Sequence, residues 1–160
     1  GEDCEIGPNA RFTNVKIGDD NHLQFIYGHD CEVKNHVTAG PYVHLRPDTV
    51  ISDHVKIGNY VEVKNSNVGE GTKLPHLTYI GDSDIGSGVN MGALHRTVIG
   101  DNAFVGCNTN LVAPVTVQAN TYIGAGSTIT KEVPENALGI ARARQKNIEG
   151  WAEKYRNEGK

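Results

Sequence analysis

Several residue types are scarce in this chain of 160 residues, and each scarcity excludes a class of protein. Aromatic residues make up 6% and there is one Trp, so a core built on large rings is excluded. No apolar run approaches the roughly 20 residues of a membrane-spanning helix. The N-terminus also lacks the basic-then-apolar pattern of a signal peptide. The three cysteines, Cys4, Cys31 and Cys107, are far apart and form no CxxC, which indicates reduced thiols and no metal site.

The charge of the chain is also low. Fifteen Lys and Arg oppose 19 Asp and Glu, and the sequence pI is near 6.0. This balance gives no electrostatic basis for binding nucleic acid or an anionic membrane. With 38% apolar residues, the chain has enough material for one domain with a core, and we expect a cytoplasmic protein. Because it begins with Gly1, we expect a processed or excised fragment.

Glycine, by contrast, is abundant, with 19 residues, and it belongs to a repeat. From Ala39 onward, apolar residues recur in fifteen steps, of which twelve are six residues long, two are five and one is eight. We call the sixteen apolar positions of this series the seam, and nine of them are followed directly by Gly. The seam positions are Ala39, Leu45, Ile51, Ile57, Val63, Val68, Leu74, Ile80, Ile85, Met91, Ile99, Val105, Leu111, Val117, Ile123 and Ile129. A period of six with a corner glycine is typical of a hexapeptide β-helix.

The period of six predicts an all-β fold. Each hexad is a short strand plus a corner, and three hexads close a triangular coil of 18 residues that must stack on its neighbours to bury its apolar seam. Glycine suits corners that need a positive φ or a crowded backbone. We expect irregular initial coils over 1–38, the regular β-helix core over 39–133, and a charged tail over 134–160 with one short helix around Trp151. No linker is expected to divide the chain.

Two cationic residues stand where the repeat more often has glycine. Arg46 and Lys64 each occupy the slot after a seam residue, where Gly is commoner, and they are 18 residues apart. They therefore fall on the same corner, one coil apart. Stacked cations repel one another unless an anion lies beside them. The alternative is that both side chains point into water.

Further polar residues fall at the same edge in the next coils. His76 can take a proton from an amine or hydroxyl near neutral pH, and Tyr79 supplies a phenol donor. Asn90 begins the following coil. The combination indicates an anion-binding pair beside a general base. Taken singly, His76 is also compatible with a structural role. Asn90 is also compatible with a corner residue whose backbone adopts the left-handed conformation. Cys107 follows a corner Gly without a basic partner in the sequence, which favours packing over nucleophilic chemistry.

The order of the motifs resembles one enzyme family over nearly the whole chain. The motifs are Gly40-Pro41-Tyr42-Val43-His44-Leu45-Arg46-Pro47, Gly58-Asn59-Tyr60-Val61-Glu62-Val63-Lys64-Asn65, His76-Leu77-Thr78-Tyr79-Ile80-Gly81-Asp82, Val89-Asn90-Met91-Gly92-Ala93, Asn110-Leu111-Val112-Ala113-Pro114-Val115-Thr116-Val117 and Ala137-Leu138-Gly139-Ile140-Ala141-Arg142. They are similar to the C-terminal acetyltransferase domain of bacterial bifunctional N-acetylglucosamine-1-phosphate uridylyltransferase/glucosamine-1-phosphate acetyltransferase. The family's N-terminal uridylyltransferase domain is absent from this sequence.

The resemblance implies a homotrimer of left-handed parallel β-helices that moves acetyl from acetyl-CoA to the amine of glucosamine-1-phosphate. It implies that His76 is the general base and that Arg46 and Lys64 hold the sugar phosphate. Tyr79 and Asn90 match further sugar contacts. It also implies acetyl-CoA contacts at Ala93, Cys107, Ala125 and Arg142, where Cys107 stands in place of the Ser of some members. Neither a metal nor a nucleic acid or membrane partner is expected.

One segment departs from the family pattern. After Ala93 the family makes a long excursion that supplies sugar contacts, whereas here the seam resumes at Ile99, eight residues after Met91. We expect the fold to tolerate the loss and the activity to be weakened by it. Two alternatives stay open: a catalytically silent trimeric scaffold, and an acyltransferase with a different small acceptor.

Overall fold

The computed structural model describes residues 1–92 and 95–158, the latter with the side chains of 95–156. The chain forms two compact units, Gly1–Gly92 and Ala93–Lys160. This division differs from the expectation that no linker separates parts of the chain. The boundary falls inside the eight-residue step, where the hexad rhythm is broken. Ala93, which the sequence analysis names, and Leu94 lie outside the described residues.

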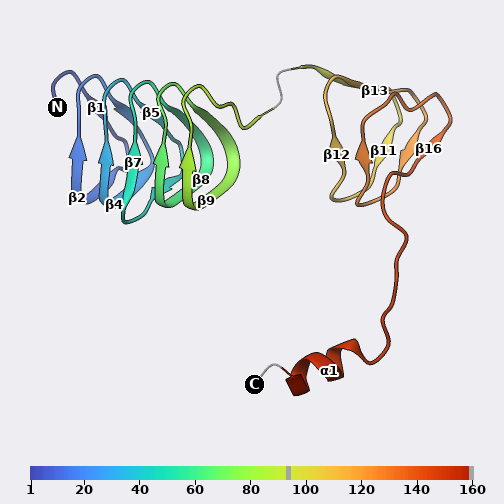
Figure 1. The fold of residues 1–160 in the computed structure, drawn as a ribbon. Helices are drawn as coiled ribbons and strands as arrows, with labels where there is room; N and C mark the ends of the chain where they lie inside the picture. Colours follow the sequence, from blue (N-terminus) through green and yellow to red (C-terminus); the bar gives the residue numbers. More distant parts are fainter. Residues whose placement is uncertain (93–94, 159–160) are drawn as a thin grey trace. The chain divides into compact units, whose positions relative to one another are not determined.

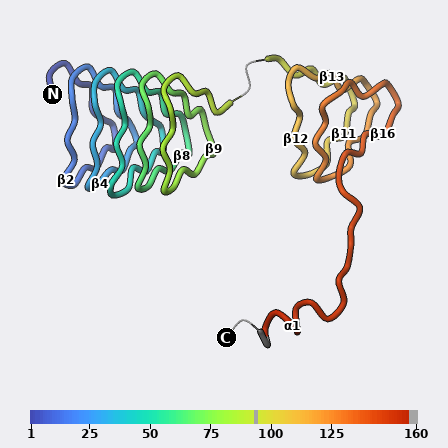
Figure 2. Tube along the Cα trace, in the orientation of Figure 1, coloured from blue at the N-terminus to red at the C-terminus, as the bar shows by residue number. Residues whose placement is uncertain are grey.

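Unit 1 is a parallel β-helix whose strands all belong to one nine-stranded sheet. Its coils stack one on the next (Figures 1 and 2). The strands are β1 (Glu5–Ile6), β2 (Arg11–Ile17), β3 (His22–Leu23), β4 (Ile26–Val33), β5 (Thr38–Ala39), β6 (Val43–Leu45), β7 (Thr49–Ile51), β8 (Lys56–Val68) and β9 (Lys73–Ile85). Partners in neighbouring coils are 16 to 18 residues apart, as in Val15↔Cys31, Val43↔Val61 and Val61↔Thr78. The expected all-β solenoid is therefore confirmed.

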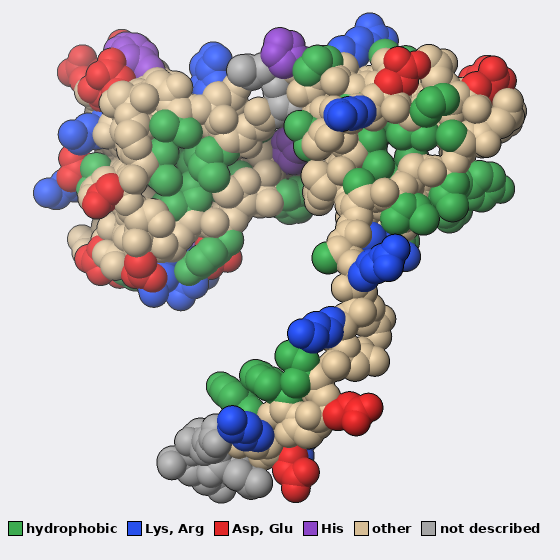
Figure 3. Space-filling model, turned by 45° about the vertical axis from the view of Figure 1, so that its right-hand side comes forward, with side chains coloured by type: hydrophobic (Ala, Val, Ile, Leu, Met, Phe, Trp, Pro, Cys, Tyr) green, Lys and Arg blue, Asp and Glu red, His purple; other side chains and the backbone are tan. Residues whose placement is uncertain are grey.

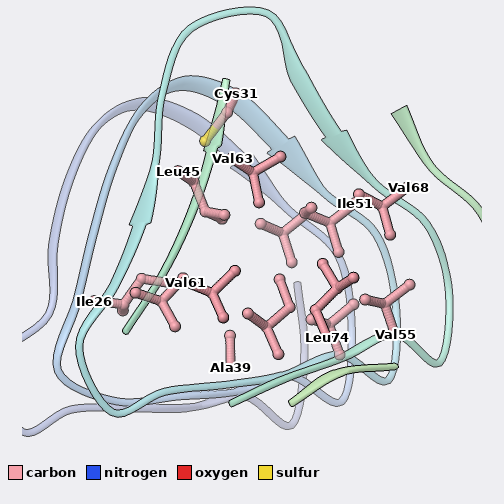
Figure 4. Close-up of a cluster of buried hydrophobic side chains, with 14 of the residues drawn as sticks. Ile26, Cys31, Ala39, Leu45, Ile51, Val55, Val61, Val63, Val68 and Leu74 are labelled. Carbon is pink, nitrogen blue, oxygen red and sulfur yellow. The ribbon is translucent and has the colours of Figure 1, made fainter. Parts of the chain in front are cut away.

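The seam residues form the core of unit 1. Leu45, Ile51, Val63 and Leu74 are fully buried, and the close-up shows aliphatic side chains from successive coils filling the interior of the triangle (Figure 4). Burial of this kind stabilises the fold by roughly 25 cal/mol per Å² of apolar area. Three successive seam residues around the end of unit 1 and the start of unit 2 are exposed: Met91 by 42%, Ile99 by 51% and Val105 by 38%.

The corners are marked by residues with positive φ, and most of them are not glycine. Each corner forms a ladder through the coils of unit 1: Asn9, Phe25, Tyr42, Tyr60 and Leu77; Asn14, Asp30, Asp48, Asn65 and Asp82; Asp20, His36, His54, Gly71 and Gly88. Asn and Asp tolerate this region better than other side chains do. Side-chain hydrogen bonds join two pairs in the second ladder, Asn14 to Asp30 and Asn65 to Asp82, each at 2.7 Å.

The glycines after the seam serve a different purpose. Of the nine, only Gly40 has a positive φ. At Gly58 an added Cβ would overlap the carbonyl oxygen of Pro75 in the next coil, and at Gly106 it would lie 2.5 Å from the amide nitrogen of Ala125. Close approach of neighbouring coils therefore explains the repeated glycine better than backbone torsion does.

Unit 2 has the same coil plan in shorter strands. They are β10 (Thr97–Ile99), β11 (Phe104–Val105), β12 (Asn110–Leu111), β13 (Val115–Val117), β14 (Tyr122–Ile123), β15 (Thr128–Ile129) and β16 (Leu138–Gly139). The parallel pairs β10–β13, β11–β14 and β12–β15 keep an 18-residue offset. Val115, Val117, Ile123, Ile129 and Val133 form a second core.

The tail beyond unit 2's coils is exposed and ends in helix α1 (Trp151–Glu158), so the expected short terminal helix is confirmed. Trp151 and Tyr155 stack on one another with ring centroids 5.0 Å apart. Apolar side chains gather on one side of this terminal segment (Figure 3). Within the described residues, no helix has the length and apolar character needed to cross a membrane.

Candidate functional site

The candidate site is built on one outward face of unit 1, which we call the polar face. It consists of the outward residues of β2, β4, β6, β8 and β9 between the corner ladder at Tyr42 and Tyr60 and the ladder at Asp48 and Asn65. Along each strand, alternate residues point inward to the core, so their neighbours line this face. Its outward residues are Arg11 and Thr13, Tyr27 and His29, His44 and Arg46, Glu62 and Lys64, Tyr79 and Gly81.

Arg46 and Lys64 lie one above the other on the polar face, as their spacing predicts. The Arg46 amide donates to the Val63 carbonyl at 2.8 Å, which places Arg46 beside Lys64 in the next coil. Each cation has a carboxylate partner: Arg46 Nη1 donates to Glu62 Oε1 at 2.8 Å, and Lys64 Nζ lies 3.6 Å from Asp82 Oδ2. Sequence reasoning foresaw an anion or water beside these cations and missed both carboxylates.

The position of Glu62 beside the cations was predictable from the sequence. Glu62 lies two residues before Lys64 and therefore shares its face of the strand. Asp82 gave no sequence signal beyond its corner position, because its reach to Lys64 depends on the geometry of the coil. A hydrogen bond from Asn65, followed by the nearby Lys64 ammonium, holds the pKa of Asp82 below its usual range. Its carboxylate is thus available to Lys64 at neutral pH.

Tyr79 lies on the same face, opposite Glu62 in the adjacent coil. Its hydroxyl folds back over Gly81: a Cβ on that glycine would lie 2.5 Å from the Tyr79 oxygen. Since Gly81 is the register partner of Lys64, the phenol lies in the coil next to Lys64. The structure thus brings Arg46, Lys64 and Tyr79 together on one face.

His76 lies at the edge of this face, on the other side of the corner at Leu77. It belongs to β9, is exposed, and pairs in register with Asn59. Its backbone carbonyl accepts a hydrogen bond from the Thr78 hydroxyl at 2.8 Å. Its ring has no hydrogen bond, ion pair or ring contact within the described part of the chain, so both ring nitrogens are free for a ligand.

Asn90 lies on the His76 side of that corner. It forms a parallel bridge with Lys73, three residues before His76, and is exposed. The five residues named from the sequence therefore form two groups in unit 1, three on the polar face and two beyond the Leu77 corner. A single ligand that touches both groups has to extend around the corner at Leu77.

The residues expected at the coenzyme lie in unit 2. The Gly126 amide donates to the Cys107 carbonyl at 2.9 Å, which stacks Cys107 and Ala125 in adjacent coils. Arg142 Nη1 donates to the Ala125 carbonyl at 2.8 Å. The three residues are exposed and adjacent. Ala93, the fourth, falls outside the described residues.

Within the described residues, no group of three or more His, Cys, Asp or Glu side chains is placed to hold a metal ion. The side chains named from the sequence offer the chemistry of an imidazole, a phenol and two cations. These are groups for binding a phosphorylated molecule and moving one proton.

Fold and sequence together define the class. Residues 30–65 and 96–131 match the model of the bacterial transferase hexapeptide (six repeats). The chain is therefore a hexapeptide-repeat β-helix protein. Among solved structures, the acetyltransferase domain of PglB from Neisseria gonorrhoeae FA1090 aligns with 85% of this chain and 54% of that chain, at 18% identity and a TM-score of 0.42.

Within that class the chain is similar in sequence to the bifunctional protein GlmU. It is 52% identical over 171 residues to GlmU of Thermoanaerobacter pseudethanolicus, and 50% identical over 171 residues to GlmU of Listeria monocytogenes serotype 4b, in both cases over 100% of this chain and 37% of the relative. The chain thus spans little more than a third of these relatives. Because the aligned 171 residues exceed its own 160, the relatives carry eleven residues that this chain lacks.

Proposed function

We propose that this chain transfers acetyl from acetyl-CoA to the amine of glucosamine-1-phosphate, producing N-acetylglucosamine-1-phosphate for UDP-N-acetylglucosamine synthesis. The proposal rests on the 52% sequence identity to a GlmU protein over the whole chain, together with the position of Arg46, Lys64 and Tyr79 on one face. An arginine and a lysine one coil apart suit a phosphate dianion, which has acceptor oxygens for both.

In the proposed reaction, His76 takes a proton from the ammonium or amine of the sugar. The nitrogen lone pair then attacks the thioester carbonyl to give a tetrahedral oxyanion. This intermediate collapses as the C–S bond breaks, and the proton held by His76 passes to the departing thiolate, while the extra proton of an ammonium acceptor goes to solvent. A backbone N–H near Ala93 is the proposed donor to the oxyanion. No described nucleophile lies beside a base, so transfer is direct within a ternary complex.

The coenzyme is proposed to lie against Cys107, Ala125 and Arg142. The Arg142 guanidinium is already positioned by the Ala125 carbonyl, and its remaining N–H groups can donate to a coenzyme phosphate. We further propose a cytoplasmic homotrimer with its active sites between protomers, and no resident metal.

The eleven residues that this chain lacks bear directly on the acceptor. We assign the difference to the shortened step between Met91 and Ile99, where a sugar-contacting excursion is missing. We expect weaker binding of the acceptor and a lower rate of transfer, since catalytic groups lose efficiency when the acceptor is held less precisely.

Mass spectrometry of the product tests the proposal. The protein is incubated with acetyl-CoA and, separately, glucosamine-1-phosphate, glucosamine and an unrelated small amine. Acetylation of the sugar phosphate in preference to both others is the expected result. Acetylation of another amine alone would indicate a different acceptor, and no product from folded protein would indicate a silent scaffold.

A further inference from the structure

His44 is a histidine on the polar face that the proposed mechanism does not use. It is the middle residue of β6, with Leu45 beside it pointing into the core. In register it lies between Tyr27 of β4 and Glu62 of β8. It therefore occupies the coil position directly next to the carboxylate that pairs with Arg46.

The imidazole of His44 is packed among rings. Its centroid is 5.0 Å from the Tyr27 ring and 5.9 Å from the His29 ring. Its Nε2 atom is buried and has no hydrogen-bond partner within the described residues. A buried nitrogen without a partner is costly, and such an atom in a folded protein calls for an explanation.

The charged and titratable neighbours of His44 come from every strand around it. Tyr27 and His29 contact it from β4, Glu62 and Lys64 belong to the neighbouring β8, and Arg46 lies two residues later, just beyond the end of β6. Burial is the main cause that lowers the pKa of His44, with His29 and Arg46 lowering it further and Glu62 opposing them. Arg46 and Glu62 form an ion pair beside this imidazole.

Glu62 has two possible cationic partners. In this structure it accepts a hydrogen bond from Arg46 at 2.8 Å. Both side chains of this pair are 39% exposed, so an anion can reach the guanidinium from solvent. An anion bound to Arg46 competes with the Glu62 carboxylate for the same N–H donors.

We propose that His44 is a positioning residue that couples anion binding at Arg46 to the uptake of one proton, by accepting the proton at its imidazole and receiving Glu62 as its partner. This deepens the proposed function and rests on it, since the phosphate of the sugar is the anion. The proton comes from solvent and goes to the imidazole, which then pairs with the released carboxylate. No other bond is made or broken.

The sign of the coupling follows from the charges. With the anion bound, Arg46 no longer opposes a positive charge on His44, and Glu62 is free to favour it, so the pKa of His44 rises. A group whose pKa rises on binding makes that binding tighter as the pH falls towards the free protein's value. Anion affinity at Arg46 is thus greatest under mildly acidic conditions.

Sulfate is the probe for the test, because it stays a dianion throughout this range, whereas a phosphate monoester titrates near pH 6. Its dissociation constant is measured by calorimetry from about pH 8 to about pH 5.5, across the range of a histidine. We expect about fivefold tighter binding at the acidic end for the wild-type protein. His44→Gln is expected to lose this dependence.

His36→Gln is the matched control, since His36 is a histidine beside an acid, with Asp20 at 3.5 Å, but lies at a corner away from the polar face. It is expected to retain the pH dependence. Glu62→Gln is expected to bind sulfate more tightly than wild type, because Arg46 loses its competitor, and to show no pH dependence. This variant carries the test if His44→Gln does not fold.

Three results would overturn the inference: an unchanged pH dependence in His44→Gln, the same loss in His36→Gln, or no sulfate binding at any pH. Acetyl transfer to glucosamine-1-phosphate is measured separately on the wild-type protein. Transfer without His44-dependent sulfate binding refutes only the coupling. His44-dependent sulfate binding without transfer refutes the proposed function and leaves an anion site with its proton linkage.

Discussion

At the scale of single residues, the site consists of cations that are already paired. Arg46 and Lys64 are each held by a carboxylate, Glu62 and Asp82, before any ligand arrives. Half-exposed pairs of this kind contribute little to stability because solvent screens them. Their effect is to fix the direction of the side chains, so that a phosphate meets donors already aimed along one face.

Loss of one of these cations is expected to weaken binding of the sugar phosphate. Lys64→Ala should raise the KM for glucosamine-1-phosphate about tenfold or more, since a charge-assisted hydrogen bond contributes about 1.5–3 kcal/mol. The matched control is Lys56→Ala, because Lys56 belongs to the same strand β8 but pairs with Thr38 and Lys73, away from the polar face. An equal rise in KM for both variants would contradict the assignment.

The cysteines offer a test of the coenzyme site. Burial raises the pKa of the Cys31 thiol to about 11, with Asp30 adding to it, so little thiolate is present near neutral pH. Cys107 is exposed and lies beside Ala125. We expect iodoacetamide to modify Cys107 and spare Cys31 in the folded protein, and acetyl-CoA to slow the reaction of Cys107. Alkylation of Cys107 at the same rate with and without acetyl-CoA would remove it from the site.

At the scale of elements, the fold was predictable because its signal is periodic. A six-residue period places the seam residues on the inner side of each coil, and Leu45, Ile51 and Val63 are buried as expected. The site was predictable in part. The spacing of 18 places Arg46 beside Lys64, but the turn at Leu77 that separates His76 from Tyr79 depends on a positive φ that no single residue type announces. The carboxylate partners depend on side-chain reach across coils, which spacing alone does not encode.

The role of the corner glycines can be tested with a matched pair. Gly58→Ala is expected to destabilise the protein by about 1–3 kcal/mol, because its Cβ would overlap the Pro75 carbonyl of the next coil. Gly86→Ala is the control: it also follows a seam residue, yet nothing lies within 4 Å of the added Cβ. Denaturant unfolding gives both values. Equal stability of the two variants would contradict the view that these glycines allow close stacking.

At the scale of the whole molecule, single chains leave apolar surface uncovered. Phe104, Tyr122 and Leu138 stand in register on adjacent strands of unit 2 and are each more than half exposed. Such a patch is typical of a surface that contacts another protein. The proposed homotrimer predicts a sedimentation-equilibrium mass of three chains at micromolar concentration. A mass of one chain across that range would exclude active sites between protomers.

The most direct test of the account is thiol release from acetyl-CoA with glucosamine-1-phosphate, measured on wild-type and His76→Ala protein together. The account predicts sugar-dependent release by the wild type, and a kcat at least about 100-fold lower in the variant with little change in KM, because only the proton acceptor is removed. An unchanged kcat in His76→Ala would contradict the assignment of the base. No release from folded wild-type trimer would contradict the proposed activity itself.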